Sequence, residues 1–155
     1  MIDEISLKIL KILQDKARIP NVEVARQVGM APSAVLERIR KLEKQGFIDG
    51  YEVRLNPSRF QRSLVGFIRL SIDSLSADRQ IETTLAALDE IQEVHYITGE
   101  DGYLLKVRVS GPTELDRLVR DKIGSIRGVR STNTAIVLST IKETARIPID
   151  DNDLV

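Results

Sequence analysis

The segment from Pro32 to Lys44 places apolar and cationic side chains at helical spacing. At about 100° per residue, Val35, Ile39 and Leu42 fall on one side and form a stripe that a core can bury. Cationic and hydrogen-bonding side chains face the other side, where they can bind phosphates and base edges. Backbone N–H groups at the helix N-terminus can also bind a phosphate. The predicted DNA-binding set, which includes two residues at the edges of the stripe, is Ser33, Leu36, Glu37, Arg38, Arg40, Lys41 and Lys44.

Two shorter helical patterns precede this segment and would support it. Asp3 is suited to cap the first helix, which fades at residues 15–18. Asn21 is suited to cap the second helix, and Gly29 can supply the left-handed residue at its end. Residues 47–55 then alternate with a period of two, which predicts a short β-hairpin. This arrangement predicts a winged helix-turn-helix, although a cationic helix face can also be simply a solvated surface.

The distribution of charge favours the DNA-binding interpretation. The 155 residues carry 23 basic and 23 acidic side chains, but residues 1–60 carry 11 basic against 8 acidic ones. The absence of cysteine and the presence of one histidine exclude thiol chemistry and a multi-histidine zinc centre. We expect no catalytic residue, cofactor or metal. Charged residues interrupt the N-terminal ten residues and no long apolar run occurs, so we expect a cytoplasmic protein without membrane partners.

The second half of the chain alternates between strand and helix patterns. The order β-α-β-β-α-β predicts an α+β, ferredoxin-like fold. The predicted strands are residues 64–72, 91–98, 103–109 and 129–141, and the predicted helices are residues 77–88 and a segment from Pro112. The expected domains are a helix-turn-helix at 1–50, a hinge at 51–62 and an αβ domain at 63–155.

The predicted strands carry apolar residues on both faces, although two helices can cover only one. Leu64 and Ile68 point to one side of the first strand, and Val65 and Phe67 to the other. An uncovered apolar face is typical of an interface, so we expect a homodimer. The alternative is that the C-terminal tail covers this face. We expect His95 on the helix-covered side, as a core or interface residue.

Several stretches, in order, resemble the Lrp/AsnC (feast/famine) family of transcriptional regulators. They are Ile9-Leu10 with Leu13-Gln14, Val28-Gly29-Met30-Ala31-Pro32-Ser33-Ala34-Val35, Arg38-Ile39-Arg40-Lys41-Leu42-Glu43, Gly46-Phe47-Ile48 with Gly50-Tyr51, and Thr98-Gly99-Glu100 with Tyr103-Leu104-Leu105-Lys106-Val107. The resemblance implies a RAM/ACT-like ligand-sensing domain after the helix-turn-helix. It also implies dimers that associate further, often into octamers, and a response to small amino acids.

The resemblance further implies an effector site between dimers. Its residues here would be Thr98, Gly99, Glu100, Asp101, Gly102, Tyr103, Thr132 and Thr134. The loop departs from the family pattern because Asp101 replaces an aromatic residue and Gly102 replaces an acidic one. A carboxylate of the loop can bind an ammonium group, and N–H or hydroxyl donors can bind a carboxylate. A polar hairpin turn would use the same residues.

These observations favour a regulator whose assembly and affinity for double-stranded DNA respond to a small effector. One alternative is an enzyme like the sirohaem decarboxylases that resemble this family, but a single histidine and 4% aromatic residues suit a tetrapyrrole pocket poorly. The other alternative is an architectural DNA-binding protein without an effector.

Overall fold

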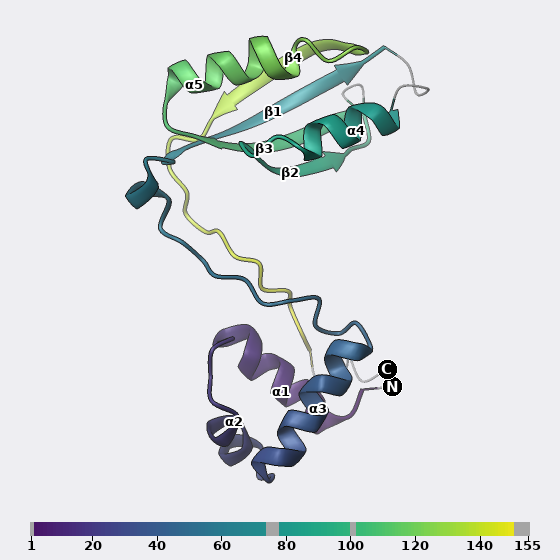
Figure 1. Ribbon diagram of the computed structural model, residues 1–155, viewed down its shortest axis with the longest axis vertical. Helices are drawn as coiled ribbons and strands as arrows, with labels where there is room; N and C mark the ends of the chain where they lie inside the picture. The colour runs from purple at the N-terminus through teal and green to yellow at the C-terminus, as the bar shows by residue number, and fades with distance from the viewer. Residues whose placement is uncertain (1, 74–77, 100–101, 151–155) are drawn as a thin grey trace. The chain divides into compact units, whose positions relative to one another are not determined.

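A computed structural model of the chain describes residues 2–73, 78–99 and 102–150. The chain divides into two compact units, each of which is described by itself (Figure 1). The helical unit comprises Met1–Arg54 with Lys142–Val155, and the αβ unit comprises Leu55–Ile141. Among the described residues, no helix combines the length and apolar character that a bilayer span needs.

The helical unit contains α1 (Glu4–Asp15), α2 (Asn21–Val28) and α3 (Pro32–Lys44). Asp3 caps α1 as predicted, because its Oδ1 accepts a hydrogen bond from the Ser6 N–H at 2.8 Å. The predicted cap on α2 is wrong: Pro20 is the N-cap residue and Asn21 is already helical. Gly29 ends α2 in the left-handed region with φ 69°, as expected.

The three helices share one apolar core, which holds α3 against α1 and α2. The most buried side chains come from all three helices and from the residue before the N-cap of α1. They are Ile2, Leu7, Ile9, Leu13, Val24, Ala25, Val35, Ile39 and Leu42.

The predicted β-hairpin after α3 is wrong, since residues 47–55 form no strand in the structure. Tyr51, Val53 and Leu55 alternate as predicted, but they are exposed, and Val53 is 84% exposed. A two-stranded hairpin is marginal unless a further layer buries one of its faces. No described part of the chain buries Val53 or Leu55, so residues 47–55 form no strand among the residues that the structure describes.

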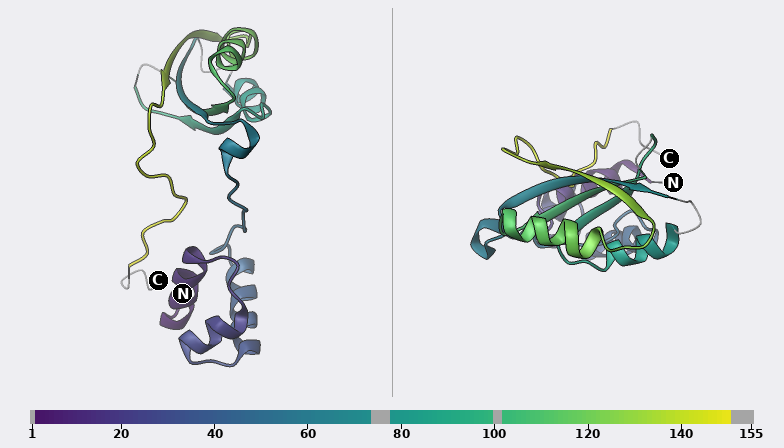
Figure 2. Two further views of the ribbon diagram at one scale, coloured as in Figure 1. Left: turned by 90° about the vertical axis from the view of Figure 1, so that its left-hand side faces the viewer. Right: turned by 90° about the horizontal axis from the view of Figure 1, so that it is seen from above.

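The αβ unit is a four-stranded antiparallel sheet in the order β2-β3-β1-β4. This order confirms the predicted ferredoxin-like layout. Helices α4 and α5 lie on the same face of the sheet (Figure 2). The elements are a 3₁₀ turn η1 (Pro57–Phe60), β1 (Leu64–Ile72), α4 (Asp78–Ala86), β2 (Ile91–Tyr96), β3 (Tyr103–Val109), α5 (Pro112–Arg117), a π-helical continuation η3 (Leu118–Ile123) and β4 (Val129–Ile136).

The last strand is shorter than predicted and ends at Ile136. The N–H of Val137 still donates to the carbonyl of Val65 at 2.9 Å, and no further pairing with β1 follows. Leu138 and Ile141 are 97% and 94% exposed. The strand ends here because β1 begins at Leu64 and offers no backbone beyond that point.

The two-sided pattern of β1 is confirmed, whereas that of β2 is altered by a bulge. Pairing between β2 and β3 shifts between Ile91 and Glu93, so that Ile91 and Val94 both pack against the core. The shift also places His95 opposite Leu104. His95 therefore lies on the face that the helices leave open, with a side chain 55% exposed, and its predicted position on the helix-covered side is wrong.

The compact units differ from the predicted division, which assigned residues 63–155 to the αβ domain. From Lys142 onward the chain clusters with the helical unit. The physical reason is a set of contacts with α1, in which Gln14 and Asp15 bind the backbone of Ile147 and the side chain of Arg146.

Candidate functional site

The exposed face of α3 matches the predicted recognition surface. Val35, Ile39 and Leu42 are 0%, 6% and 3% exposed and anchor the helix to the core. The residues that project into solvent are Ser33, Leu36, Glu37, Arg40, Lys41 and Lys44. The structure thus brings six of the seven predicted residues to one exposed surface.

The cations of this surface are available to a ligand. Arg40, Lys41 and Lys44 have no hydrogen bond or ion pair with any other described residue. At the other end of the helix, the N-cap residue Ala31 offers no side-chain acceptor, and Pro32 follows it. The first-turn N–H groups of α3 therefore lack a side-chain cap. Free cations and open backbone donors on one helix suit a polyanion.

Arg38 differs from the other predicted residues because it faces α1. Its Nη1 donates to Oδ2 of Asp3 at 2.5 Å and to Oγ of Ser6 at 3.0 Å. The guanidinium, together with the N–H of Ser6, lowers the pKa of Asp3 to about 2. Asp3 thus caps α1 and holds α3 with the same carboxylate. Sequence spacing placed Arg38 at the edge of the buried stripe but gave no signal for this partner.

The predicted effector loop joins β2 to β3 and is described at its two ends. Thr98 and Gly99 are exposed, whereas Glu100 and Asp101 lie outside the described residues. The N–H of Gly102 donates to the carbonyl of Leu70 at 3.0 Å, and its carbonyl accepts from the N–H of Ile97 at 3.0 Å. Gly102 is therefore fixed to the sheet, and its N–H is already used.

Tyr103 is a core residue, although the sequence analysis assigned it to the effector site. It is 1% exposed, and its hydroxyl donates to Oε1 of Glu82 in α4 at 2.9 Å. Its ring meets that of Tyr96 edge to face, with centroids 5.3 Å apart. In the described chain Tyr103 supports the loop from beneath, and Glu82 is a supporting residue that the sequence analysis missed.

Thr132 lies at the same end of the sheet as the loop, but not beside it. Leu70 pairs with Tyr103 on one side and with Thr132 on the other, so one strand separates the two ends of this row. Two strand spacings correspond to about 10 Å. Thr132 is half-buried, while Thr134 is exposed and lies opposite Ile68, further from the loop.

The chain matches two family descriptions that together cover most of its length. Residues 2–49 match a winged helix-turn-helix DNA-binding family, and residues 65–147 match the Lrp/AsnC ligand binding domain. The boundary between the two matches falls near the division into the two structural units.

Individual relatives agree with these matches. The leucine-responsive regulatory protein of Escherichia coli is 38% identical over 150 residues, which cover 96% of this chain and 92% of the relative. Among solved structures, a transcriptional regulator of Neisseria meningitidis in complex with L-methionine has a TM-score of 0.91 at 31% identity and covers 96% of this chain and 97% of its own. AsnC of Escherichia coli has a TM-score of 0.88 at 28% identity and covers 96% and 99%.

Proposed function

The chain belongs to the Lrp/AsnC family of transcriptional regulators, and on this premise we propose that it binds double-stranded DNA through the exposed face of α3. We propose further that a small amino acid bound to the αβ unit changes this affinity. The observation that carries the proposal is that Arg40, Lys41 and Lys44 form no hydrogen bond or ion pair with the described residues, on a helix whose opposite side is anchored in the core.

Binding by one copy would use few cations, so the proposal includes a homodimer that can assemble further. Two recognition helices about 34 Å apart would reach successive major grooves on one side of the duplex. The open face of the sheet supports this assembly, since Phe67 on that face is 37% exposed and would be covered by a second copy.

The DNA contact is tested by substituting Arg40→Ala together with Lys41→Ala. Each lost phosphate contact should flatten the dependence of log affinity on log salt concentration by about 1. The matched control is Arg79→Ala with Arg127→Ala, which removes the same charge from exposed positions of the αβ unit. Duplex binding is measured by fluorescence anisotropy over a range of salt concentrations. An unchanged slope in the α3 variant would overturn the assignment of this helix.

For the effector we propose an amino acid with an apolar side chain, of the kind named with two relatives. One relative is described as leucine-responsive, and another was crystallised with L-methionine. In this chain, the hydroxyls of Thr98, in the loop after β2, and of Thr132, in β4, supply polar groups at one end of the sheet. Because β1 lies between these two groups within one copy, a second copy of the chain would have to complete the site. Effector binding would then be coupled to assembly.

The effector proposal is tested with L-leucine and L-methionine as probes. A ligand that binds only the folded state raises the free energy of unfolding by RT ln(1 + [L]/Kd), so thermal unfolding should shift upward with concentration. Thr132→Val should reduce the shift without changing the unliganded midpoint greatly, whereas Thr140→Val, at an exposed position outside the sheet, should not. No shift with either amino acid would favour an architectural DNA-binding protein.

A further inference from the structure

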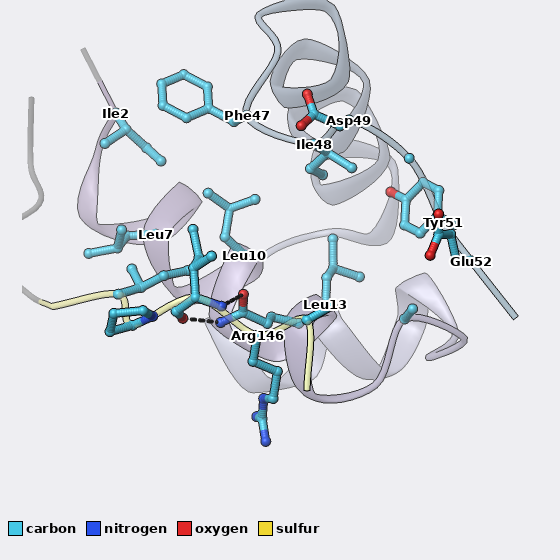
Figure 3. A pocket seen from close by; sticks show the side chains of 17 residues that line it. Ile2, Leu7, Leu10, Leu13, Phe47, Ile48, Asp49, Tyr51, Glu52 and Arg146 are labelled. Carbon is cyan, nitrogen blue, oxygen red and sulfur yellow. Dashed lines mark hydrogen bonds between the residues drawn. The ribbon is translucent and has the colours of Figure 1, made fainter. Parts of the chain in front are cut away.

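The C-terminal strap, defined here as residues 145–149, lies on α1 of the helical unit. Nε2 of Gln14 donates to the carbonyl of Ile147 at 2.8 Å, and Oε1 of Gln14 accepts from the N–H of Ile147 at 3.0 Å. Figure 3 shows this pair of bonds as dashed lines. One side chain thus satisfies both backbone groups of one strap residue.

The primary amide of Gln14 is well suited to this pair of bonds. It presents one donor and one acceptor side by side, as a neighbouring strand would present them. Two further contacts flank the pair. Arg146 Nη2 lies 2.6 Å from Oδ1 of Asp15, and Ile149 packs against the core of the helical unit. The strap is therefore held at a specific register on α1.

The strap is nevertheless loosely packed. Ile147 is 65% exposed, and the strap contains no helix or strand. Between the strap, α1 and residues 47–52 lies a cavity of about 770 Å³, lined mainly by apolar side chains, with Leu7, Leu10 and Leu13 on the α1 side (Figure 3). Segments with few buried contacts open at a small cost in free energy, so this strap can dock and release without unfolding the helices.

The strap directly follows the second covalent connection between the units. The first runs through the residues after α3, and the second leaves β4 at Ile136 and reaches the strap through residues 137–144. Because Thr132 and Thr134 belong to β4, the proposed effector residues and the strap lie on one continuous stretch of chain.

We propose that the strap is a reversible clamp that restrains the helical unit, and that its docking on Gln14 raises the affinity for DNA. A docked strap limits the orientations of α3 relative to the rest of the assembly. The helical unit then loses less conformational entropy when it binds DNA, and the affinity is higher. A change at β4 that pulls on residues 137–144 would release the strap and weaken binding. This inference rests on the proposed function and adds a route for its regulation.

The test uses the full chain with Gln14→Ala and Ile149→Ala, two uncharged truncations that remove the paired bonds and the apolar contact. The control is Gln80→Ala with Ile126→Ala, which truncates the same residue types in the αβ unit, where Ile126 packs against the core as Ile149 does in the helical unit. Hydrogen–deuterium exchange of the Ile147 amide reports docking, and fluorescence anisotropy at fixed salt reports binding to duplex DNA. Far-UV circular dichroism verifies that both double variants keep the helices.

The strap variant should exchange the Ile147 amide about tenfold faster and bind duplex DNA at least about threefold more weakly, with the salt slope unchanged. The control should match the unsubstituted chain in both measurements. Unchanged exchange would show that the bonds to Gln14 do not hold the strap, and faster exchange with unchanged affinity would show a purely local contact. Either result overturns the proposal. If the unsubstituted chain binds no duplex DNA, that result contradicts the proposed function, on which the clamp proposal rests.

Discussion

The ion pair between Asp3 and Arg38 separates a structural role for Arg38 from a role in DNA binding. Arg38→Met keeps a long side chain with good helix propensity but removes the charge and its donors. Asp3→Asn removes the negative charge and keeps a residue that caps helices well, so the bond from the Ser6 N–H to the cap can persist. The two substitutions and their combination form a double-mutant cycle.

The expected loss in free energy of unfolding follows from the two hydrogen bonds of Arg38 and from the exposure of the side chains that form them. Nη1 of Arg38 binds the Asp3 carboxylate and the Ser6 hydroxyl, and the side chains of Arg38 and Asp3 are 30% and 56% exposed. A partly solvated ion pair contributes about 0.5–1 kcal/mol, and the bond to Ser6 adds about 0.5–1 kcal/mol. Arg38→Met should therefore lower the free energy of unfolding by about 1.5 kcal/mol, with a coupling to Asp3 of about 0.5–1 kcal/mol.

The coupling should depend on pH with a definite sign. The pKa of Asp3 is lowered from 3.8 to about 2 in the folded chain, first by the bond from Arg38 and then by the N–H of Ser6. A lowered pKa means that the folded state favours the carboxylate. The stabilisation is thus fully present above about pH 4 and is lost as the pH falls through 2. Solvent screening keeps the measured effect below the full value of the shift.

Urea unfolding followed by circular dichroism measures the cycle, and anisotropy with duplex DNA measures binding. We expect Arg38→Met to destabilise the chain and leave the salt slope of binding unchanged. If instead the coupling is zero and the salt slope flattens by about 1, Arg38 is a phosphate ligand and its pairing with Asp3 is incidental. That result would refute the structural interpretation.

Two further substitutions test the local structure around the sites. Gly29→Ala should lower the free energy of unfolding by about 1 kcal/mol, because φ at Gly29 is 69°. The control Gly50→Ala, at a residue whose φ is not positive, should leave urea unfolding almost unchanged. Tyr103→Phe should lower the free energy of unfolding by about 1 kcal/mol through loss of the bond to Glu82, while the exchange of the Gly102 amide should rise if Tyr103 supports the loop. An unaltered stability for either Gly29→Ala or Tyr103→Phe would contradict the corresponding conformation or contact.

Local patterns predicted the bounds and the buried stripe of α3 accurately. Pro32 begins α3 and Lys44 ends it, and the stripe of Val35, Ile39 and Leu42 is buried as the helical period requires. Helical periodicity succeeds here because one face of an amphipathic helix must enter the core, whatever the partner helices are.

The same reasoning failed where a residue depends on a distant partner or on a single shift in register. One bulge in β2 moved His95 to the open face, since side chains alternate and each inserted residue reverses them. The predicted hairpin at 47–55 had the right alternation but lacked a layer to cover it. The sequence analysis assigned Tyr103 to the effector loop. In the structure it lies in the core, where its hydroxyl donates to the carboxylate of Glu82, 21 positions earlier.

The sequence alone determined three features: the order of helices and strands, the sign of charge on each half, and the exposed cations of α3. It could do so because periodicity and charge are local properties. The tertiary structure alone decided that Arg38 binds Asp3 across 35 positions and that Ile147 binds Gln14 across 133. Those pairings depend on how the helices cross and where the chain returns. Hydrogen bonds between residues so far apart leave no periodic signal in a single sequence.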